Sequence, residues 1–297
     1  ARVLHAAGVA IISAGVLIQL TQSLPMRLRG RMMGYFGLPG FVMLGLGPVV
    51  SEWLLYRWDF RILFLSLPVL FLTIGGVLYR LPRAETERSE GCRPRLLEAL
   101  RASYGLLRSV LFFSVIFGFC FSAWHTFIAP AVQPRVGTGG VSAYGLGYGL
   151  GAILTRLGLS HRLDHGAGRY LSISTLALYG ISLASIPYAS TAHALVGLGL
   201  VCGMAHGTYY PSLSSIAAER FHPLHGGQGM SLYISASSLG MFLGPPVWGT
   251  ITDRAGYGAM FVLAGLTLTA ATIVFVAAQY RARHIRPWSE DRVLERE

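Results

Sequence analysis

Charged residues are scarce in this chain of 297 residues, and lysine is absent altogether. Only 12% of the residues are Asp, Glu, Lys or Arg, and all 24 basic residues are Arg. A soluble domain of this size needs more charge to cover its surface. With 53% hydrophobic residues and a mean hydropathy of +0.53, the composition predicts an integral membrane protein with the lipid bilayer as a partner.

Cysteine is equally scarce, and enzyme motifs are missing. Cys92 lies in a predicted loop, while Cys120 and Cys202 lie in apolar runs, so we expect no disulfide. The histidine-containing loops at residues 161–165 and 222–225 lack a third convergent ligand, so we expect no metal. Sequences typical of nucleotide hydrolysis or metalloproteolysis are absent. The sequence therefore predicts neither an enzyme nor a bound cofactor.

Long apolar runs, by contrast, fill most of the chain. Each comes close to the roughly 20 residues that cross a hydrocarbon core. Nine such runs cover residues 3–24, 32–54, 62–79, 109–133, 141–159, 170–189, 192–215, 230–251 and 258–280. We therefore expect an all-α integral membrane protein with nine spans.

The arginines indicate the orientation of these spans. With Arg156 at the inner end of span five included, nineteen of the 24 lie in the C-terminal tail and at the connections after spans one, three, five and seven. Because an excess of Arg marks the cytoplasmic face, we expect a plasma-membrane protein with a cytoplasmic C-terminus. The same arginines are spread over five loops without a basic aromatic module, so no nucleic-acid partner is expected.

One stretch of sequence occurs twice, 197 residues apart, without a gap. The identical pairs include Gly30 and Gly227, Gly47 and Gly244, Pro48 and Pro245, and Phe64 and Phe261. Duplication of a helix, a turn and a helix in the same order predicts a membrane carrier whose halves are parallel repeats.

The repeat also predicts how the chain is divided. The spans 109–133, 141–159 and 170–189 precede the second copy, and at the same offset their counterparts would lie before residue 1. We therefore expect the last nine helices of a twelve-helix carrier, with about 90 residues preceding them. The expected parts are residues 1–81, three spans of the N-terminal bundle; 82–108, a cytoplasmic linker; 109–280, a C-terminal six-helix bundle; and 281–297, a cytoplasmic tail. Within the linker, residues 96–100 are expected to form an amphipathic surface helix.

Short motifs along the chain resemble those of the major facilitator superfamily, in the order of its fourth to twelfth helices. The segment from Arg2 to Gly8 resembles the opening of the fourth helix, with His5 in place of Gln. Pro25 and the Arg29–Gly30 pair resemble the turn into the fifth helix.

Gly47–Pro48 resembles the core of the fifth-helix motif of exporting antiporters, although Ser51–Glu52 stands where that motif has two glycines. The residues that resemble the loop between the eighth and ninth helices are Arg162, Asp164, Gly168 and Arg169.

This resemblance implies a monomeric secondary active transporter that moves a small organic solute by alternating access. We expect transport to be outward and coupled to protons. The outward direction is inferred from the Gly47–Pro48 motif alone. An uptake carrier of the same fold, a membrane enzyme that uses His125 and His206, and a non-transporting remnant remain alternatives.

A few polar residues in the spans are candidates for chemistry. The resemblance implies that Arg2 serves the proton pathway or binds anionic groups, and the alternative is an interfacial Arg at a helix end. No Asp or Glu lies in the middle of a predicted span. His125 and His206 are the two deep histidines, and they are candidates for titration because the ordinary pKa of His is about 6.5.

Aromatic and amide side chains near these histidines are the other candidates for lining a substrate cavity. They are Gln19, Trp124, Tyr209 and Tyr210. For each of them, packing in a helix interface is the alternative role.

Glycines repeat at four-residue spacing in two spans. Gly145, Gly147, Gly149 and Gly151 form two overlapping pairs, and Gly199, Gly203 and Gly207 form a second series. This spacing predicts close helix packing. The Gly47–Pro48 and Gly244–Pro245 pairs remove backbone donors, which predicts bends or static packing contacts.

Overall fold

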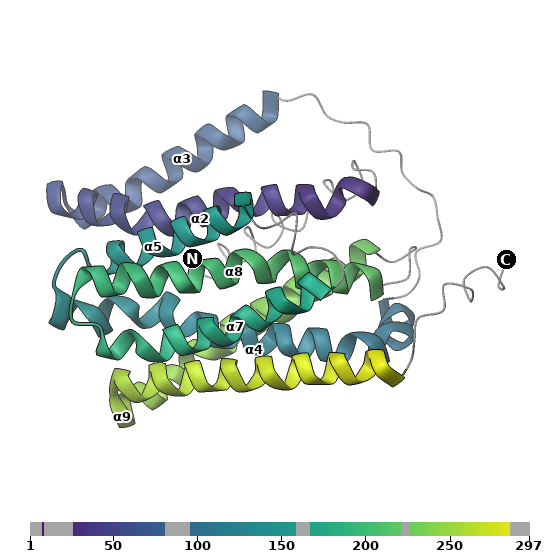
Figure 1. Cartoon of the computed structure of the whole chain (residues 1–297). Helices are drawn as coiled ribbons and strands as arrows, with labels where there is room; N and C mark the ends of the chain where they lie inside the picture. Colours follow the sequence, from purple (N-terminus) through teal and green to yellow (C-terminus); the bar gives the residue numbers. More distant parts are fainter. Residues whose placement is uncertain (1–7, 9–25, 81–95, 159–166, 221–225, 286–297) are drawn as a thin grey trace.

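All regular structure in the described part of the chain is helical, as the sequence predicts. The computed structural model describes residues 8, 26–80, 96–158, 167–220 and 226–285. Its helices are α2 (Met26–Arg57), α3 (Phe60–Arg80), α4 (Leu96–Val136), α5 (Gly140–Gly158), α7 (Ala167–Ser185), the 3₁₀ helix η1 (Ile186–Tyr188), α8 (Ala192–Arg220) and α9 (Gly226–Ile285). They lie side by side as an elongated bundle (Figure 1). Except for Gly8, the predicted first span lies outside the described residues, as do Arg2 and Gln19.

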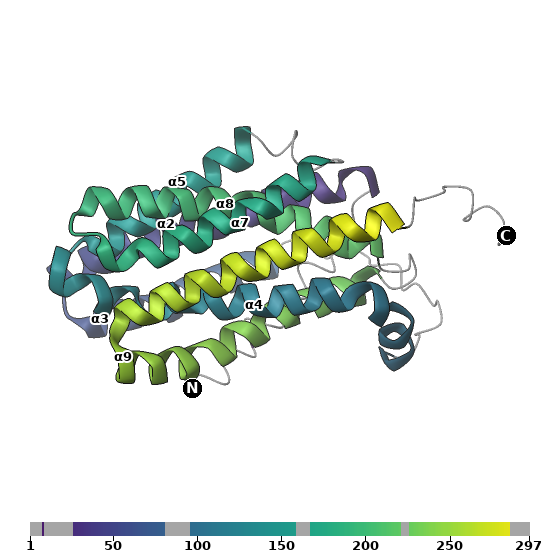
Figure 2. The same cartoon turned by 60° about the horizontal axis from the view of Figure 1, so that its bottom comes forward.

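Helix α9 consists of two arms that fold back on each other. Gly256 has non-helical dihedral angles, φ 80° and ψ 168°, within the range Gly226–Ile285. A positive φ of this kind costs glycine little because it has no β-carbon. Figure 2 shows the arms running in opposite directions from a turn. The turn falls between the predicted spans 230–251 and 258–280.

The sequence repeat is visible as a structural repeat. Helix α2 ends at Arg57 and α3 begins at Phe60. The offset of 197 residues places Asp59, in the break between them, over Gly256, in the break of α9. The helix, turn and helix predicted from the repeat are therefore present in both copies.

The two copies differ in what covers their second helix. In the second arm of α9, Phe261, Ala264 and Leu268 are fully buried, because this helix packs against other helices, among which α4 and α7 have extensive contacts with α9. In α3 the corresponding Phe64, Leu67 and Phe71 are 55%, 42% and 54% exposed. Helix α3 packs mainly on α2, so its apolar face has no such cover among the described residues.

The number of helices suited to crossing a membrane is smaller than the nine spans expected. Among the described residues, four stretches are long and apolar enough: Gly37–Arg57, Phe60–Val77, Ser109–Val136 and Leu232–Gln279, the last holding both arms of α9. Helices α5 and α8 are not among these stretches. Helix α7 contributes only to the shorter apolar stretch Ile173–Tyr188.

The expected linker ends earlier than residue 108. Helix α4 starts at Leu96 and continues to Val136, so residues 96–100 are its first residues and not a separate surface helix. The helix continues through Gly105, which is tolerated in a helix interior at a cost of about 1 kcal/mol relative to Ala.

Helix α5 lies between α2 and α8, and its glycines face both neighbours. A β-carbon at Gly147 or Gly151 would meet backbone of α8, whereas one at Gly145 or Gly149 would meet backbone of α2. The two overlapping pairs predicted from the sequence thus serve two interfaces. Helix α2 remains helical through Pro48. The carbonyl of Leu44, which loses a donor to this proline, lies 3.1 Å from the β-carbon position of Gly145.

Candidate functional site

The best candidate for a functional site is a cluster of aromatic rings around His206 in α8. The rings of Phe117 and Phe121, both in α4, lie 5.1 and 5.4 Å from the His206 ring. Phe41 of α2 makes an edge contact with the same ring at 5.2 Å. The cluster therefore joins α2 to α4 and α8 within the bundle.

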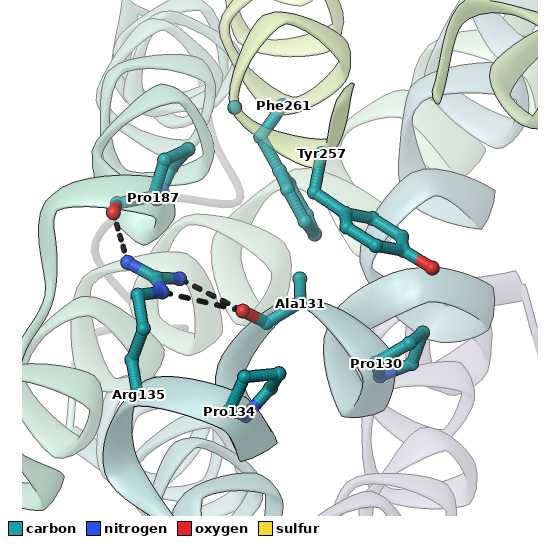
Figure 3. A pocket seen from close by; sticks show the side chains of 8 residues that line it. Pro130, Ala131, Pro134, Arg135, Pro187, Tyr257 and Phe261 are labelled. Carbon is teal, nitrogen blue, oxygen red and sulfur yellow. Dashed lines mark hydrogen bonds between the residues drawn. The ribbon is translucent and has the colours of Figure 1, made fainter. Parts of the chain in front are cut away.

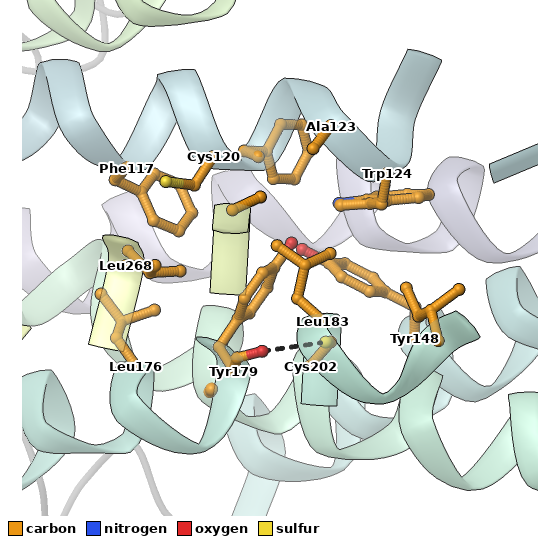
Figure 4. Packing of buried hydrophobic residues seen from close by; sticks show 14 of the residues in the cluster. Phe117, Cys120, Ala123, Trp124, Tyr148, Leu176, Tyr179, Leu183, Cys202 and Leu268 are labelled. Atoms are coloured by element: carbon orange, nitrogen blue, oxygen red, sulfur yellow. Dashed lines mark hydrogen bonds between the residues drawn. The ribbon is translucent and has the colours of Figure 1, made fainter. Parts of the chain in front are cut away.

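Tyr148 of α5 supplies the polar contact of this cluster. Its hydroxyl forms a hydrogen bond with Nδ1 of His206. Tyr148 itself is fully buried, and its ring points toward Tyr179 of α7 in the packed interior (Figure 4). The imidazole is thus held between aromatic rings by the hydrogen bond at Nδ1.

The two tyrosines expected to line a cavity take different roles. Tyr209 is buried and packs on Phe117, with ring centroids 4.4 Å apart. Tyr210 is half-buried and contacts Tyr233 of α9. Packing, the alternative that the sequence left open, describes the ring of Tyr209 well.

Trp124 and His125 are neighbours in α4, with ring centroids 5.7 Å apart, and they differ in burial. Trp124 is buried between Tyr144 and Tyr148, with ring centroids 5.2 and 5.0 Å away, and Figure 4 shows it beside Tyr148 in the packed cluster. Its Nε1 donor has no hydrogen-bond partner among the described residues. His125 is exposed. Both histidines contact Phe121, and the described contacts include none between them, so a paired acid and base is not formed.

Arg156 is the functional candidate that the sequence analysis missed. It was counted with the cytoplasmic arginines, yet the structure buries it near the end of α5 with 4% of its surface exposed. Its guanidinium acts electrostatically on His206 and Tyr210. The signal was present, because Arg156 is the only Arg inside the nine predicted spans. A buried cation in a membrane helix is costly and commonly functional.

The motif residues are placed unevenly. A β-carbon on Gly47 would have no neighbour within 4 Å, whereas Pro48 lies 3.0 Å from the β-carbon position of Gly145. Gly244 packs on Phe119 and Ser122 of α4, and Pro245 follows it in α9. Arg29, Gly30, Gly168 and Arg169 lie in the first turns of α2 and α7. Arg162 and Asp164 lie outside the described residues.

A pocket lies at the end of α4, away from the His206 cluster. The pocket of about 300 Å³ is lined mainly by proline and aromatic side chains from α4, η1 and α9 (Figure 3). Arg135 at its edge donates hydrogen bonds to the carbonyl oxygens of Ala131, Ile186, Pro187 and Ala189. These bonds join the end of α4 to η1 and leave none of the five N–H donors of Arg135 for a ligand.

Metal chemistry finds no support in the described part of the chain. No group of three His, Cys, Asp or Glu side chains there could hold an ion. Cys120 and Cys202 are buried free thiols, and Cys92 lies outside the described residues.

Comparison with known proteins adds a family and a set of distant relatives. The model of a family described as the Major Facilitator Superfamily matches residues 1–162 and 134–294. Monocarboxylate transporter 10 of Rattus norvegicus is 32% identical over 98 residues, 33% of this chain and 19% of that protein. The Danio rerio protein of the same name is 27% identical over 129 residues, 43% of this chain and 24% of its own length. The chain thus spans less than a quarter of the curated relatives it matches.

Proposed function

This chain belongs to the major facilitator superfamily, and from that premise we propose that it moves a small organic anion by alternating access between two helical bundles. Membership makes it a multi-pass membrane transporter and not an enzyme. Our proposal adds the nine spans, the two bundles, the cytoplasmic C-terminus and the class of solute.

Arg156 is the observation that carries the anion proposal. A guanidinium that is buried in a membrane helix is stabilised by a partner of opposite charge. A carboxylate is well suited to it, because its two oxygens match the planar fork of donors. The similarity to proteins named monocarboxylate transporters favours the same class of ligand.

His206 is the proposed site of proton coupling. It contacts Phe41, which comes from α2, and rings of α4, so it lies where a movement of α2 would change its surroundings. Histidine changes charge near neutral pH more readily than other side chains. Transport coupled to protons would then follow if His206 gains a proton in one arrangement of the helices and loses it in the other. Outward transport is supported only by the resemblance of Gly47–Pro48 to the exporter motif.

The experiment that tests this proposal uses the purified chain in sealed vesicles. Labelled short monocarboxylates are offered from either side, with the pH gradient in either direction. We expect saturable flux that a pH gradient drives, that Arg156→Gln abolishes and that Arg156→Lys partly restores. Arg61→Gln is the matched control, because Arg61 is exposed and pairs loosely with Asp59.

Flux of carboxylates that is unchanged in Arg156→Gln would contradict the anion proposal. Flux that builds up solute inside vesicles only when the cytoplasmic face is outward would support export, and the opposite polarity would favour the uptake carrier of the same fold.

A further inference from the structure

The contact between α2 and α5 is close at one end only. From Phe41 to Glu52, α2 lies antiparallel to the segment of α5 from Gly149 back to Ser142. A β-carbon on Gly45 would lie 3.2 Å from the Cα of Gly149. One turn before Phe41 the contact ends, because a β-carbon on Gly37 would have no α5 atom within 4 Å.

At the close end of the α2–α5 interface, the two helices also make a polar contact. The hydroxyl of Ser142 donates a hydrogen bond to Oε2 of Glu52. Both residues lie near a turn, since α2 ends at Arg57 and α5 begins at Gly140. The α2–α3 and α4–α5 turns lie at the same end of the bundle (Figure 1).

Glu52 is an unusual residue for this place. It is half-buried in the interface between the helices, where a carboxylate loses hydration that a hydrogen bond must replace. A hydrophobic or small residue would fill the interface without that cost. Its neighbour Ser51 shows the contrast, because the Ser51 hydroxyl bonds to the Gly47 carbonyl of its own helix, at 2.7 Å.

We propose that the Glu52–Ser142 hydrogen bond is a positioning contact that holds this end of the two bundles closed, and that it breaks when the transporter opens there. This inference rests on the proposed alternating access, in which α2 and α5 belong to different bundles. With the expected orientation of the chain, the closed end faces outward. Glu52 would then favour the inward-open arrangement without contacting the solute.

The test measures access to the interface and needs no solute. Leu44→Cys places a thiol in the α2–α5 interface, where the native Leu44 is half-buried. Its rate of reaction with a membrane-impermeant maleimide is measured in sealed vesicles that expose the Glu52 end, and the parent chain gives the background. Because one hydrogen bond would be lost, Ser142→Ala or Glu52→Ala should raise the rate about three- to tenfold.

Three controls decide whether the hydrogen bond itself is responsible. Ser51→Ala should leave the rate unchanged, because that hydroxyl bonds within α2. Glu52→Gln should fall between the parent and Glu52→Ala, since its amide oxygen can still accept the bond. Ser142→Ala with Glu52→Ala should give no larger increase than either alone. Equal effects of Ser142→Ala and Ser51→Ala, or additive effects of the pair, would overturn the proposal.

A second variant covers the case in which the alanine variants fold poorly. Glu52→Cys with Ser142→Cys should form a disulfide on oxidation, stop flux in vesicles and recover flux on reduction. A cross-linked chain that transports normally would overturn the proposal. If the maleimide reaction rates change as expected but the chain moves no solute, the Glu52–Ser142 contact is supported and the proposed transport function is contradicted.

Discussion

The two faces of α5 show two kinds of helix contact made from the same residue type. Toward α8, carbonyl groups of Val196 and Leu200 occupy the space that β-carbons of Gly147 and Gly151 would need. Toward α2, the β-carbon positions of Gly145 and Gly149 lie 2.9 to 3.4 Å from their nearest neighbours. The face of α5 toward α8 has no room for even one carbon atom. On the face toward α2, a β-carbon would need its neighbours to move by only a few tenths of an ångström.

This difference matches what each contact must do in the proposed cycle. Helices α5 and α8 both lie in the part of the chain that follows the linker, and a rigid bundle needs backbones that do not separate. Helices α2 and α5 belong to different bundles, which must part and rejoin. A contact that is close but not fully interlocked can do so without rebuilding its packing.

The largest effect is expected from filling the α8–α5 contact. In Gly203→Val, the new side chain would collide with the backbone of Tyr148. Backbone cannot move aside as a flexible side chain can, so we expect a loss of at least about 3 kcal/mol of stability, or no folded protein. Thermal unfolding and monodispersity in detergent measure this effect. A stable, active Gly203→Val protein would mean that the α8 face is no tighter than the α2 face.

A smaller effect is expected from adding a single methyl group on the other face of α5. In Gly149→Ala, the β-carbon would lie 2.9 Å from the Cα of Gly45 and 3.0 Å from the carbonyl oxygen of Phe41. We expect a folded protein with about 1 kcal/mol less stability and a marked change in transport rate, because the bundles no longer close fully. Flux in vesicles and unfolding in detergent should be compared on one preparation. If Gly149→Ala loses stability without a change in flux, the face of α5 toward α2 is a packing contact of the same kind as the face toward α8.

The polar link between α5 and α8 can be tested without touching either glycine face. Tyr148→Phe removes the hydroxyl that bonds to Nδ1 of His206 and keeps the ring. One hydrogen bond contributes about 1 kcal/mol, so we expect a small loss of stability and slower flux under a pH gradient. His206→Ala is the companion variant, and the two effects should not add. Full additivity would show that the two side chains act separately.

The smallest effect is expected at Gly47, although the sequence motif singles it out. A β-carbon there would have no neighbour within 4 Å. Because Ala is the better helix former, Gly47→Ala should change stability by less than about 1 kcal/mol, toward stabilisation. Flux and thermal unfolding should both be near the parent values. A severe loss of flux or stability would mean that Gly47 makes a close contact only in another arrangement of the helices.

The sequence predicted the parts of the structure that depend on spacing along one helix. The four-residue intervals of the α5 glycines indicated close helix packing, and the apolar runs 230–251 and 258–280 left room between them for the turn at Gly256. These features were predictable because a helix turns by a constant angle per residue, and because a duplicated sequence adopts a similar local structure.

Features that depend on which helices become neighbours were not predictable in the same way. The bond between Tyr148 and His206 joins residues 58 positions apart, and no spacing rule connects them. Arg156 was counted with the cytoplasmic arginines, although it lies inside the predicted span 141–159, because hydropathy locates the ends of spans poorly. The two copies of the repeat also show that burial depends on neighbouring helices. Equivalent positions in α3 and in the second arm of α9 differ in burial because different helices pack against them.

Arg135 has one further consequence for how this protein tolerates sequence change. All of the acceptors that its guanidinium uses are main-chain oxygens, in Ala131 and in the segment 186–189. The side chains of that segment can therefore vary while its anchor to α4 persists. Lysine, with three donors on a single nitrogen, cannot span the same set of oxygens. At this corner of the molecule, evolutionary freedom in one segment depends on the constancy of a single residue in another.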